Sequence, residues 1–197
     1  ISALLAGTTL AGAPVFPVSA LSGAGMGELK DHLERIARSF APRDASGNFR
    51  LAVDRCFNLT GAGTVVTGTA LSGTLAVGAQ VRALMAGVTL RVRSIHAQNK
   101  HSESCRAGER CALNLAGTEL RHAQITRGEW IVTGEVPAPA QRIDARVRVL
   151  AGEKQPLANW TPVHIHLGAT DVTGRVAVLE GPGIAPGESG LVQLVLE

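Results

Sequence analysis

Apolar residues recur at a spacing of three and four over residues 29–40, and this spacing predicts an amphipathic helix. The apolar positions are Leu29, Leu33, Ile36, Ala37 and Phe40, whereas most positions between them are charged. An apolar stretch at 14–18 and a glycine-rich bend at 22–25 come first, so we expect a strand, a loop and then the helix. Residues 1–7 are expected to end a preceding helix. Such a β-α unit cannot cover its own apolar surface, which indicates an excised piece of an α/β domain.

Beyond residue 48 the pattern changes to short apolar or alternating segments that glycine and proline separate. Six strands are expected at 49–59, 64–71, 80–86, 89–97, 110–116 and 129–133. Six short strands with almost no helical pattern favour a closed antiparallel β-barrel, because closure pairs the strand edges. Four more strands are expected at 142–150, 162–168, 172–180 and 190–196, which are too few to close a barrel comfortably. The predicted fold class is therefore mainly β, with a closed barrel, a partial second barrel and a preceding β-α remnant.

Two stretches divide this pattern into units. Residues 42–48 are polar, and residues 136–141 are rich in proline and alanine, so both are expected to be linkers. The predicted units are then residues 1–41, the barrel at 49–135 and the partial barrel at 142–197.

Composition excludes several classes of protein. The chain has 197 residues, 45% of them hydrophobic, which suits one large or two to three small folded units. No apolar run approaches the roughly 18–20 residues that a membrane-spanning helix needs, so we expect a cytoplasmic protein with no membrane partner. We also expect a monomer. Sixteen of the nineteen cations are arginine, which gives some weight to an anionic partner, while an aromatic content of 3% argues against a single-strand stacking platform.

The cysteines do not form a recognisable framework. Cys56, Cys105 and Cys111 are odd in number and lack metal-type spacing, which argues against both a disulfide framework and a zinc site. We expect three free thiols that pack as small apolar residues in the barrel.

The strand predicted at 49–59 contains a conflict. Its alternation places Phe49, Leu51, Val53, Phe57 and Leu59 on one apolar face, and the same alternation puts Arg55 among them. A buried arginine costs free energy unless it is paired, lies at a rim or is displaced by a β-bulge. Asp54 is adjacent and could neutralise Arg55 or accept a hydrogen bond from a ligand's amino group.

Three other features have a plain interpretation. Gly61-Ala62-Gly63 lies between two strands and not before a helix, so it predicts a hairpin turn and not a phosphate loop. His164 and His166 alternate on a strand without a third ligand nearby, which favours a solvent face over a metal site, and no metal ligand is expected. Arg142, Arg146 and Arg148 are compatible with either RNA phosphates or a solvated strand edge.

The passage FRLAVDRCFNLTGAGTVVTGTALSG at 49–73 resembles the second domain of translational GTPases of the elongation factor Tu group. Together with RSIHAQN at 93–99, AGERCALN at 107–114 and ITRGEW at 125–130, it is similar to bacterial selenocysteine-specific elongation factors. The resemblance implies that residues 1–41 end a GTPase domain and that 142–197 begin a third domain. The chain would then be an internal fragment of a longer translation factor.

The resemblance also implies a set of site residues. Asp54, Arg55 and Arg110 match positions lining the aminoacyl pocket, where elongation factor Tu has two acidic residues and a neutral amide. His96, Gln98 and Asn99 match the stretch beside the terminal adenosine of the tRNA. Ser19, Ala20 and Leu21 match the fifth guanine-nucleotide motif.

No catalytic residue is expected in this chain, because the motifs that bind GTP phosphates and Mg²⁺ would lie upstream. The complete protein would be a GTPase that uses GTP and Mg²⁺, binds selenocysteinyl-tRNA and the ribosome, and reads a messenger RNA hairpin through C-terminal domains. Two alternatives stay open: the barrel of another elongation factor Tu-like GTPase, such as a sulfate-activating one, and a stand-alone nucleic-acid-binding or structural barrel.

Overall fold

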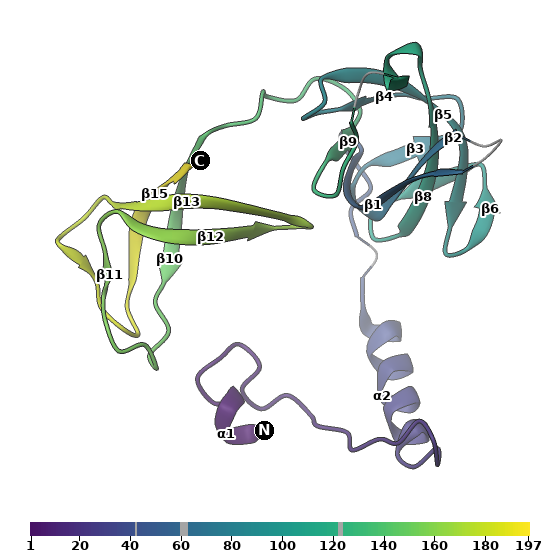
Figure 1. Cartoon of the computed structure of the whole chain (residues 1–197). Helices are drawn as coiled ribbons and strands as arrows, with labels where there is room; N and C mark the ends of the chain where they lie inside the picture. The colour runs from purple at the N-terminus through teal and green to yellow at the C-terminus, as the bar shows by residue number, and fades with distance from the viewer. Residues whose placement is uncertain (42, 60–62, 122–123) are drawn as a thin grey trace.

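The computed structural model describes residues 1–41, 43–59, 63–121 and 124–197 (Figure 1). Its N-terminal part holds two helices, α1 (Ser2–Leu5) and α2 (Met26–Ser39), of which α2 confirms the predicted amphipathic helix. Gly25 precedes α2 with a φ of 72°, and a Cβ there would lie 2.1 Å from the carbonyl oxygen of Pro17. The strand predicted at 14–18 is wrong, since these residues are extended but belong to none of the described sheets. Pro14 and Pro17 have no N–H to donate to a neighbouring strand.

The middle of the chain forms a closed antiparallel barrel, as predicted. Its strands run in the order β4-β9-β1-β2-β8-β5, and pairing between β4 and β5 closes the ring. The six strands are β1 (Arg50–Leu59), β2 (Gly63–Ser72), β4 (Gln80–Ala83), β5 (Val88–Ala97), β8 (Arg110–Ala116) and β9 (Trp130–Val132). Sequence analysis missed three short strands, β3 (Thr74–Ala76), β6 (Lys100–Ser102) and β7 (Ser104–Arg106), and the 3₁₀ helix η1 (Thr118–Arg121). Strands of three residues are too short for an alternating pattern to be recognised.

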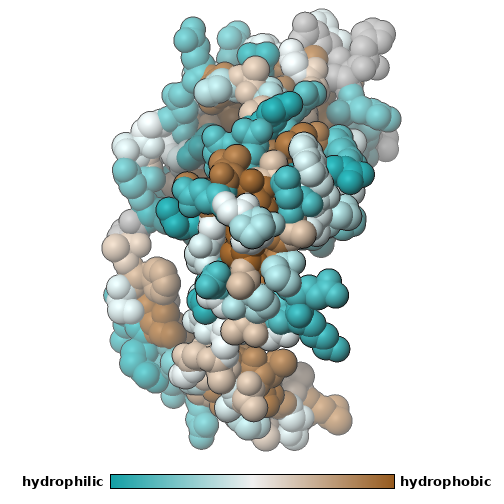
Figure 2. Space-filling view, turned by 90° about the vertical axis from the view of Figure 1, so that its left-hand side faces the viewer, coloured by the Kyte–Doolittle hydropathy of each residue, from teal (hydrophilic) through white to brown (hydrophobic). Residues whose placement is uncertain are grey.

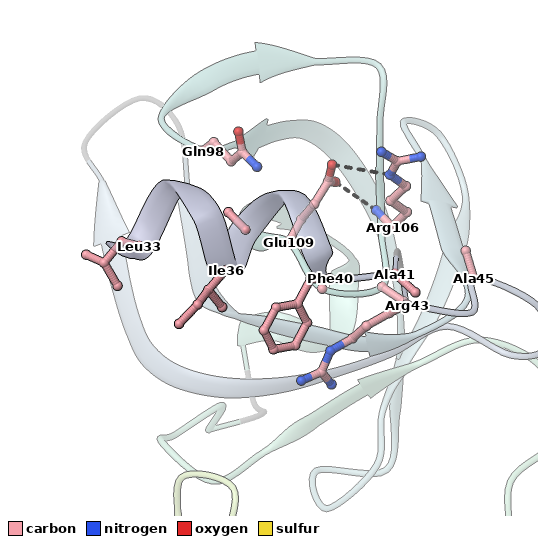
Figure 3. Close-up of a pocket in the computed structure, with 12 residues that line it drawn as sticks. Leu33, Ile36, Phe40, Ala41, Arg43, Ala45, Gln98, Arg106 and Glu109 are labelled. Atoms are coloured by element: carbon pink, nitrogen blue, oxygen red, sulfur yellow. Dashed lines mark hydrogen bonds and ion pairs between the residues drawn. The ribbon is translucent and has the colours of Figure 1, made fainter. Parts of the chain in front are cut away.

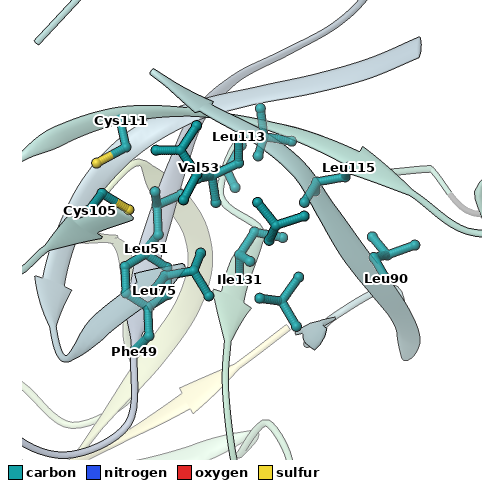
Figure 4. Close-up of a cluster of buried hydrophobic side chains, with 14 of the residues drawn as sticks. Phe49, Leu51, Val53, Leu75, Leu90, Cys105, Cys111, Leu113, Leu115 and Ile131 are labelled. Carbon is teal, nitrogen blue, oxygen red and sulfur yellow. The ribbon is translucent and has the colours of Figure 1, made fainter. Parts of the chain in front are cut away.

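The barrel encloses the main hydrophobic core (Figure 4). Its largest fully buried side chains come from all around the ring and include Phe49, Leu51, Leu75, Leu90, Ile95, Leu113, Leu115 and Ile131. Burying each such side chain contributes about 1.5–3 kcal/mol, so this core dominates the stability of the barrel.

A β-bulge resolves the conflict at Arg55. In the pairing of β1 with β2, Val53 lies opposite Gly68 and Arg55 lies opposite Thr67, which leaves Asp54 as an extra residue. The bulge reverses the alternation, so Arg55 is exposed and Cys56 packs against the core. The prediction that Phe57 and Leu59 share the apolar face is therefore wrong, because both lie beyond the bulge and are largely exposed.

A second, open sheet follows the barrel and has the order β10-β15-β13-β12. Its strands are β10 (Arg142–Arg148), β12 (Thr161–Leu167), β13 (Thr170–Val178) and β15 (Ser189–Leu196), and the pair β11 (Leu157–Ala158) and β14 (Gly183–Ile184) lies beside it. A smaller core of Val149, Val176, Ile184 and Val192 supports this sheet. Four strands in an open sheet agree with the predicted partial barrel.

The tip of the β12–β13 hairpin contacts the barrel. Thr170 Oγ1 donates a hydrogen bond to the carbonyl oxygen of Gly128 at 3.0 Å, and Arg127 Nε donates to that of Ala169 at 3.1 Å. A Cβ on Gly168 would lie 3.4 Å from the side chain of Ala52, so the hairpin backbone approaches β1 closely. This contact joins the two β units.

The N-terminal segment leaves much apolar surface exposed. No residue of α2 is buried, and its apolar residues Leu33 and Ile36 are exposed, as is Phe40 directly after the helix. Figure 2 shows hydrophobic residues at the surface of the lower half of the molecule, where α1 and α2 lie in Figure 1. Within the described residues, no helix combines the length and the apolarity needed to cross a membrane.

Candidate functional site

A pocket of about 560 Å³ lies on the outer face of the barrel, over strands β1, β2, β8 and β5. Its lining residues are Arg55, Phe57, Thr67, His96, Gln98, Asn99, Arg110, Cys111 and Ala112. Sequence analysis selected five of these, from three separate parts of the chain, and the fold brings them together. Asp54, the sixth, contacts the pocket through Arg110.

Strand register explains why these residues meet. Across neighbouring strands, Arg55 lies opposite Thr67, Thr67 opposite Ala112, and Ala112 opposite His96. The row continues to His101 on β6, whose ring packs edge-on against that of His96 with centroids 5.7 Å apart. Because residues in one cross-strand row point to the same face, five strands present this row on the outside of the barrel.

Asp54, Thr67 and Arg110 form one hydrogen-bonded network. Thr67 Oγ1 donates to Asp54 Oδ1 at 2.7 Å, and Arg110 Nη2 contacts the same oxygen at 3.2 Å. Arg110 Nη1 pairs with Asp54 Oδ2, so the guanidinium meets both carboxylate oxygens. The bond from Arg110 is the main cause that holds the pKa of Asp54 below its ordinary value, and the same bond raises the pKa of Arg110.

Arg55 differs from Arg110 in its surroundings. Asp54 pairs with Arg110 and not with its sequence neighbour, and among the described residues Arg55 forms no ion pair within 4 Å. Two guanidinium groups thus lie near a single carboxylate, which leaves the site with an excess of positive charge. Such a site favours an anionic ligand.

Gln98 and Asn99 form a tight turn at one side of the pocket. Their φ angles are 52° and 62°, and the flanking residues Ala97 and Lys100 pair across β5 and β6. Two successive left-handed residues in a two-residue hairpin are typical of a type I′ turn, for which asparagine is well suited and glutamine is not. The backbone N–H of Gln98 donates to the carbonyl oxygen of Arg110 at 3.2 Å, which fixes the turn against β8.

A neighbouring hollow of about 700 Å³ lies between α2 and the barrel and also has Gln98 in its lining (Figure 3). One side is apolar and consists of Leu33, Ile36 and Phe40. The other side carries an ion pair in which Arg106 Nε lies 3.7 Å from Glu109 Oε1. Sequence analysis did not predict this hollow, because it depends on where α2 lies relative to the barrel.

The remaining candidate residues lie away from the pocket. Ser19, Ala20 and Leu21 lie in a loop before α2, where the N–H of Ser19 donates to the carbonyl oxygen of Ala24 at 3.0 Å and Leu21 is fully exposed. Asp171 faces both His164 and His166, at 3.3 and 3.7 Å, and both histidines are exposed. In the part of the chain that the structure describes, no group of three or more His, Cys, Asp or Glu residues could hold a metal ion.

The other predicted features have mixed outcomes. Arg142, Arg146 and Arg148 alternate on the exposed face of β10, which is an edge strand. Gly61 and Ala62 of the predicted hairpin turn lie outside the described residues, although Leu59 pairs with Gly63. All three cysteines are free, and Cys105 and Cys111 are buried in the barrel core (Figure 4).

Two polar residues of this region were not predicted: Thr67, which lines the pocket, and His101, which continues the cross-strand row beside it. Thr67 was hidden in an alternating strand, where a threonine is ordinary on an outward position. Only the register with Arg55 and Ala112 shows that it faces the network. His101 lies on one of the three-residue strands, which the pattern did not detect.

Comparison with known proteins agrees with this fold. The family model described as elongation factor Tu domain 2 matches residues 63–132. A second model, described as the β-barrel domain of selenocysteine-specific elongation factor, matches residues 144–197. These matches and the barrel define a β-barrel region of the elongation factor Tu class of translation factors.

Its relatives identify the particular family. The chain is 38% identical to the selenocysteine-specific elongation factor of Desulfomicrobium baculatum over 98% of the chain, and 41% identical to that of Escherichia coli over 85%. It is thus homologous to the selenocysteine-specific elongation factors over most of its length. The chain spans 30% and 26% of the length of these two relatives.

Solved structures show the same fold. The apo form of translation elongation factor SelB from Methanococcus maripaludis matches the whole chain with a TM-score of 0.83, at 24% identity, and the chain covers 46% of it. A structure of that protein in complex with the GTP analogue GppNHp gives a TM-score of 0.76, at 22% identity, with the same coverage.

Proposed function

We propose that the pocket on the barrel binds the aminoacylated end of selenocysteinyl-tRNA. In this proposal Asp54, Arg55 and Arg110 face the aminoacyl group. His96, Gln98 and Asn99 face the ribose and ester of the terminal adenosine. The observation that carries the proposal is the excess of arginine over carboxylate in one pocket, in a chain homologous to selenocysteine-specific elongation factors.

The charge of the pocket suits the chemistry of selenocysteine. A selenol is more acidic than a thiol, so this side chain is an anion near neutral pH, whereas the serine hydroxyl stays neutral. Hydrogen bonds to an ionised group are about twice as strong as neutral ones, so guanidinium groups favour the selenolate. Specificity is a difference between two affinities. Selenocysteine and serine side chains are similar in size, so their difference in charge is what the pocket can use to distinguish them.

The same homology supports a proposed domain organisation. Residues 1–41 would end a GTPase domain, with Ser19–Leu21 supporting the guanine ring, and residues 42–48 would link it to domain II at 49–135. Residues 136–141 would lead into part of domain III at 142–197. In the complete protein, the residues that hold the GTP phosphates and Mg²⁺ would lie outside this chain. The chain alone would then neither bind GTP tightly nor hydrolyse it.

The complete protein would deliver selenocysteinyl-tRNA to the ribosome in the cytoplasm, as a GTP-dependent monomer. Further C-terminal domains would read a hairpin in the messenger RNA. The M. maripaludis complex with a GTP analogue, the match to elongation factor Tu domain 2 and the names of the relatives support this assignment.

The test is a comparison of two dissociation constants at fixed salt, for selenocysteinyl-tRNA and seryl-tRNA, with the complete factor. We expect a clear preference for selenocysteinyl-tRNA that the double variant Arg55→Ala/Arg110→Ala loses. Arg82→Ala is the matched control, because Arg82 is exposed on β4 and does not line the pocket. Equal binding of the two aminoacyl-tRNAs by the wild-type protein would refute the proposal.

A further inference from the structure

We infer that the two arginines of the pocket have different roles: Arg55 is the cation that distinguishes an anionic side chain, whereas Arg110 is a positioning residue held on Asp54 by Thr67. Both carboxylate oxygens of Asp54 are engaged by Arg110, and Thr67 Oγ1 donates to one of them at 2.7 Å. The charge of Arg110 is therefore already compensated inside the protein.

Arg55 is placed differently on the same strand as Asp54. The bulge places Arg55 on the outer face opposite Thr67, at the pocket wall, and no described carboxylate lies within 4 Å of its guanidinium. A ligand anion meets this guanidinium without first breaking an ion pair. Contact between the anion and Arg110 would instead compete with Asp54, which costs part of the energy gained.

Thr67 helps to hold the Asp54 carboxylate and the Arg110 guanidinium in one fixed arrangement. Its hydroxyl donates to Asp54 Oδ1 and lies 3.4 Å from Arg110 Nη2, so it touches both members of the pair. Thr67 is central in the row between Arg55 and Ala112, and its replacement would loosen the pair without touching Arg55 directly.

Labelling the arginines of this chain tests the inference without tRNA. Phenylglyoxal attacks the uncharged guanidine, so a guanidinium in an ion pair reacts slowly. With peptide mapping by mass spectrometry, we expect Arg55 to be modified faster than Arg110. The variants Asp54→Asn and Thr67→Val should accelerate modification of Arg110, and Thr67→Ser should restore the slow rate.

The matched control is Thr64→Val, on the same strand. Thr64 donates to Asn58 Oδ1 at 2.8 Å, so this variant also removes a threonine hydrogen bond between β1 and β2, but outside the pocket. It should leave the rate at Arg110 unchanged. Equal rates at Arg55 and Arg110 in the wild-type chain, or a rate at Arg110 that Asp54→Asn does not change, would overturn the inference.

A second experiment rests on the proposed function and uses the complete factor. Arg55→Ala should lower the ratio of affinities for selenocysteinyl-tRNA and seryl-tRNA by about tenfold or more, the effect of losing one hydrogen bond to a charged group. Arg110→Ala should weaken both complexes by similar factors and leave the ratio within about twofold, because a positioning residue acts on either ligand. A ratio that falls with Arg110→Ala and not with Arg55→Ala refutes the division of roles. Failure of the wild-type protein to prefer selenocysteinyl-tRNA refutes the proposed function and leaves the labelling result intact.

Discussion

Among the described residues of the barrel, Glu129 is the buried charged residue, and its replacement by glutamine should destabilise the fold strongly. The side chain is only 3% exposed and accepts three hydrogen bonds from backbone N–H groups. Its Oε1 accepts from Met85 at 2.7 Å and from Trp130 at 2.8 Å, and its Oε2 accepts from Ala86 at 2.9 Å. Glu129 therefore ties the turn between β4 and β5 to the start of β9.

The magnitude follows from counting these bonds. Glutamine keeps one acceptor oxygen for Met85 and Trp130 but turns an NH₂ group toward the N–H of Ala86. Two bonds lose their charge assistance at roughly 1 kcal/mol each, and the half-buried N–H of Ala86 is left unsatisfied at about 1–3 kcal/mol. Relief from burying a carboxylate offsets part of this, so we expect a net loss of about 2–4 kcal/mol. For a chain of this size the melting temperature should fall by roughly 5–15 °C.

The assay is urea unfolding followed by tryptophan fluorescence. Trp130 lies in the barrel and Trp160 precedes β12 of the second sheet, so a Trp160→Phe background makes the signal specific for the barrel. Glu103→Gln, at an exposed position, is the control and should change stability by less than about 0.5 kcal/mol. An effect of Glu129→Gln within that same range would refute this accounting of hydrogen bonds.

Three further predictions concern the bulge, the ion pair and the thiols. Gly68→Ala should destabilise the barrel by about 1–3 kcal/mol or more, since its Cβ would lie 2.1 Å from the carbonyl oxygen of Ala52. The control Gly27→Ala places its Cβ in open space and should not destabilise the protein. Equal urea midpoints for the two variants would contradict this prediction. Arg110 holds the pKa of Asp54 below the ordinary 3.8, so the stability that the ionised carboxylate contributes is present above pH 3.8 and lost as the pH falls through the lowered value. The Asp54→Asn variant should therefore unfold at a lower urea concentration than wild type at pH 7. If the difference between the two urea midpoints does not narrow below pH 3.8, the ionised Asp54 carboxylate is not its cause. Contact with Cys111 and burial raise the pKa of the Cys105 thiol. Alkylation of the folded protein should therefore leave Cys105 unmodified until urea is added. Equal alkylation of Cys105 with and without urea would contradict this prediction.

Five of the residues chosen from the sequence line one pocket of the fold, whereas the residues around them were not predicted. Arg55 stood out because alternation placed a charge on an apolar face, and the three possible explanations included the bulge that the structure shows. Which explanation applied depended on Gly68, because its lack of a side chain lets the backbone of β1 approach closely at Ala52. That is a contact between two strands, and no pattern within one strand records it.

The errors have a common physical origin. Residues 14–18 are apolar and extended, yet a strand exists only where another strand accepts its hydrogen bonds. The pairing of Asp54 with Arg110 joins residues on β1 and β8, so adjacency in sequence suggested the wrong partner, Arg55. Local sequence patterns therefore predicted most helices and strands, whereas the pairing register between strands determined which side chains contact one another.

The bulge at Asp54 divides the segment around β1 into two parts whose side chains are subject to different constraints. Before it, Phe49, Leu51 and Val53 are constrained by the volume of the core, where a single methylene is felt. After it, Arg55 and Phe57 line the pocket, and under the proposed function the aminoacyl ligand would constrain them. Under the proposed function, related barrels could exchange the residues after the bulge to accept a different aminoacyl group, while the residues before it, and with them the fold, stay unchanged. Deleting one codon at the bulge would remove this independence, because every side chain beyond it would change face.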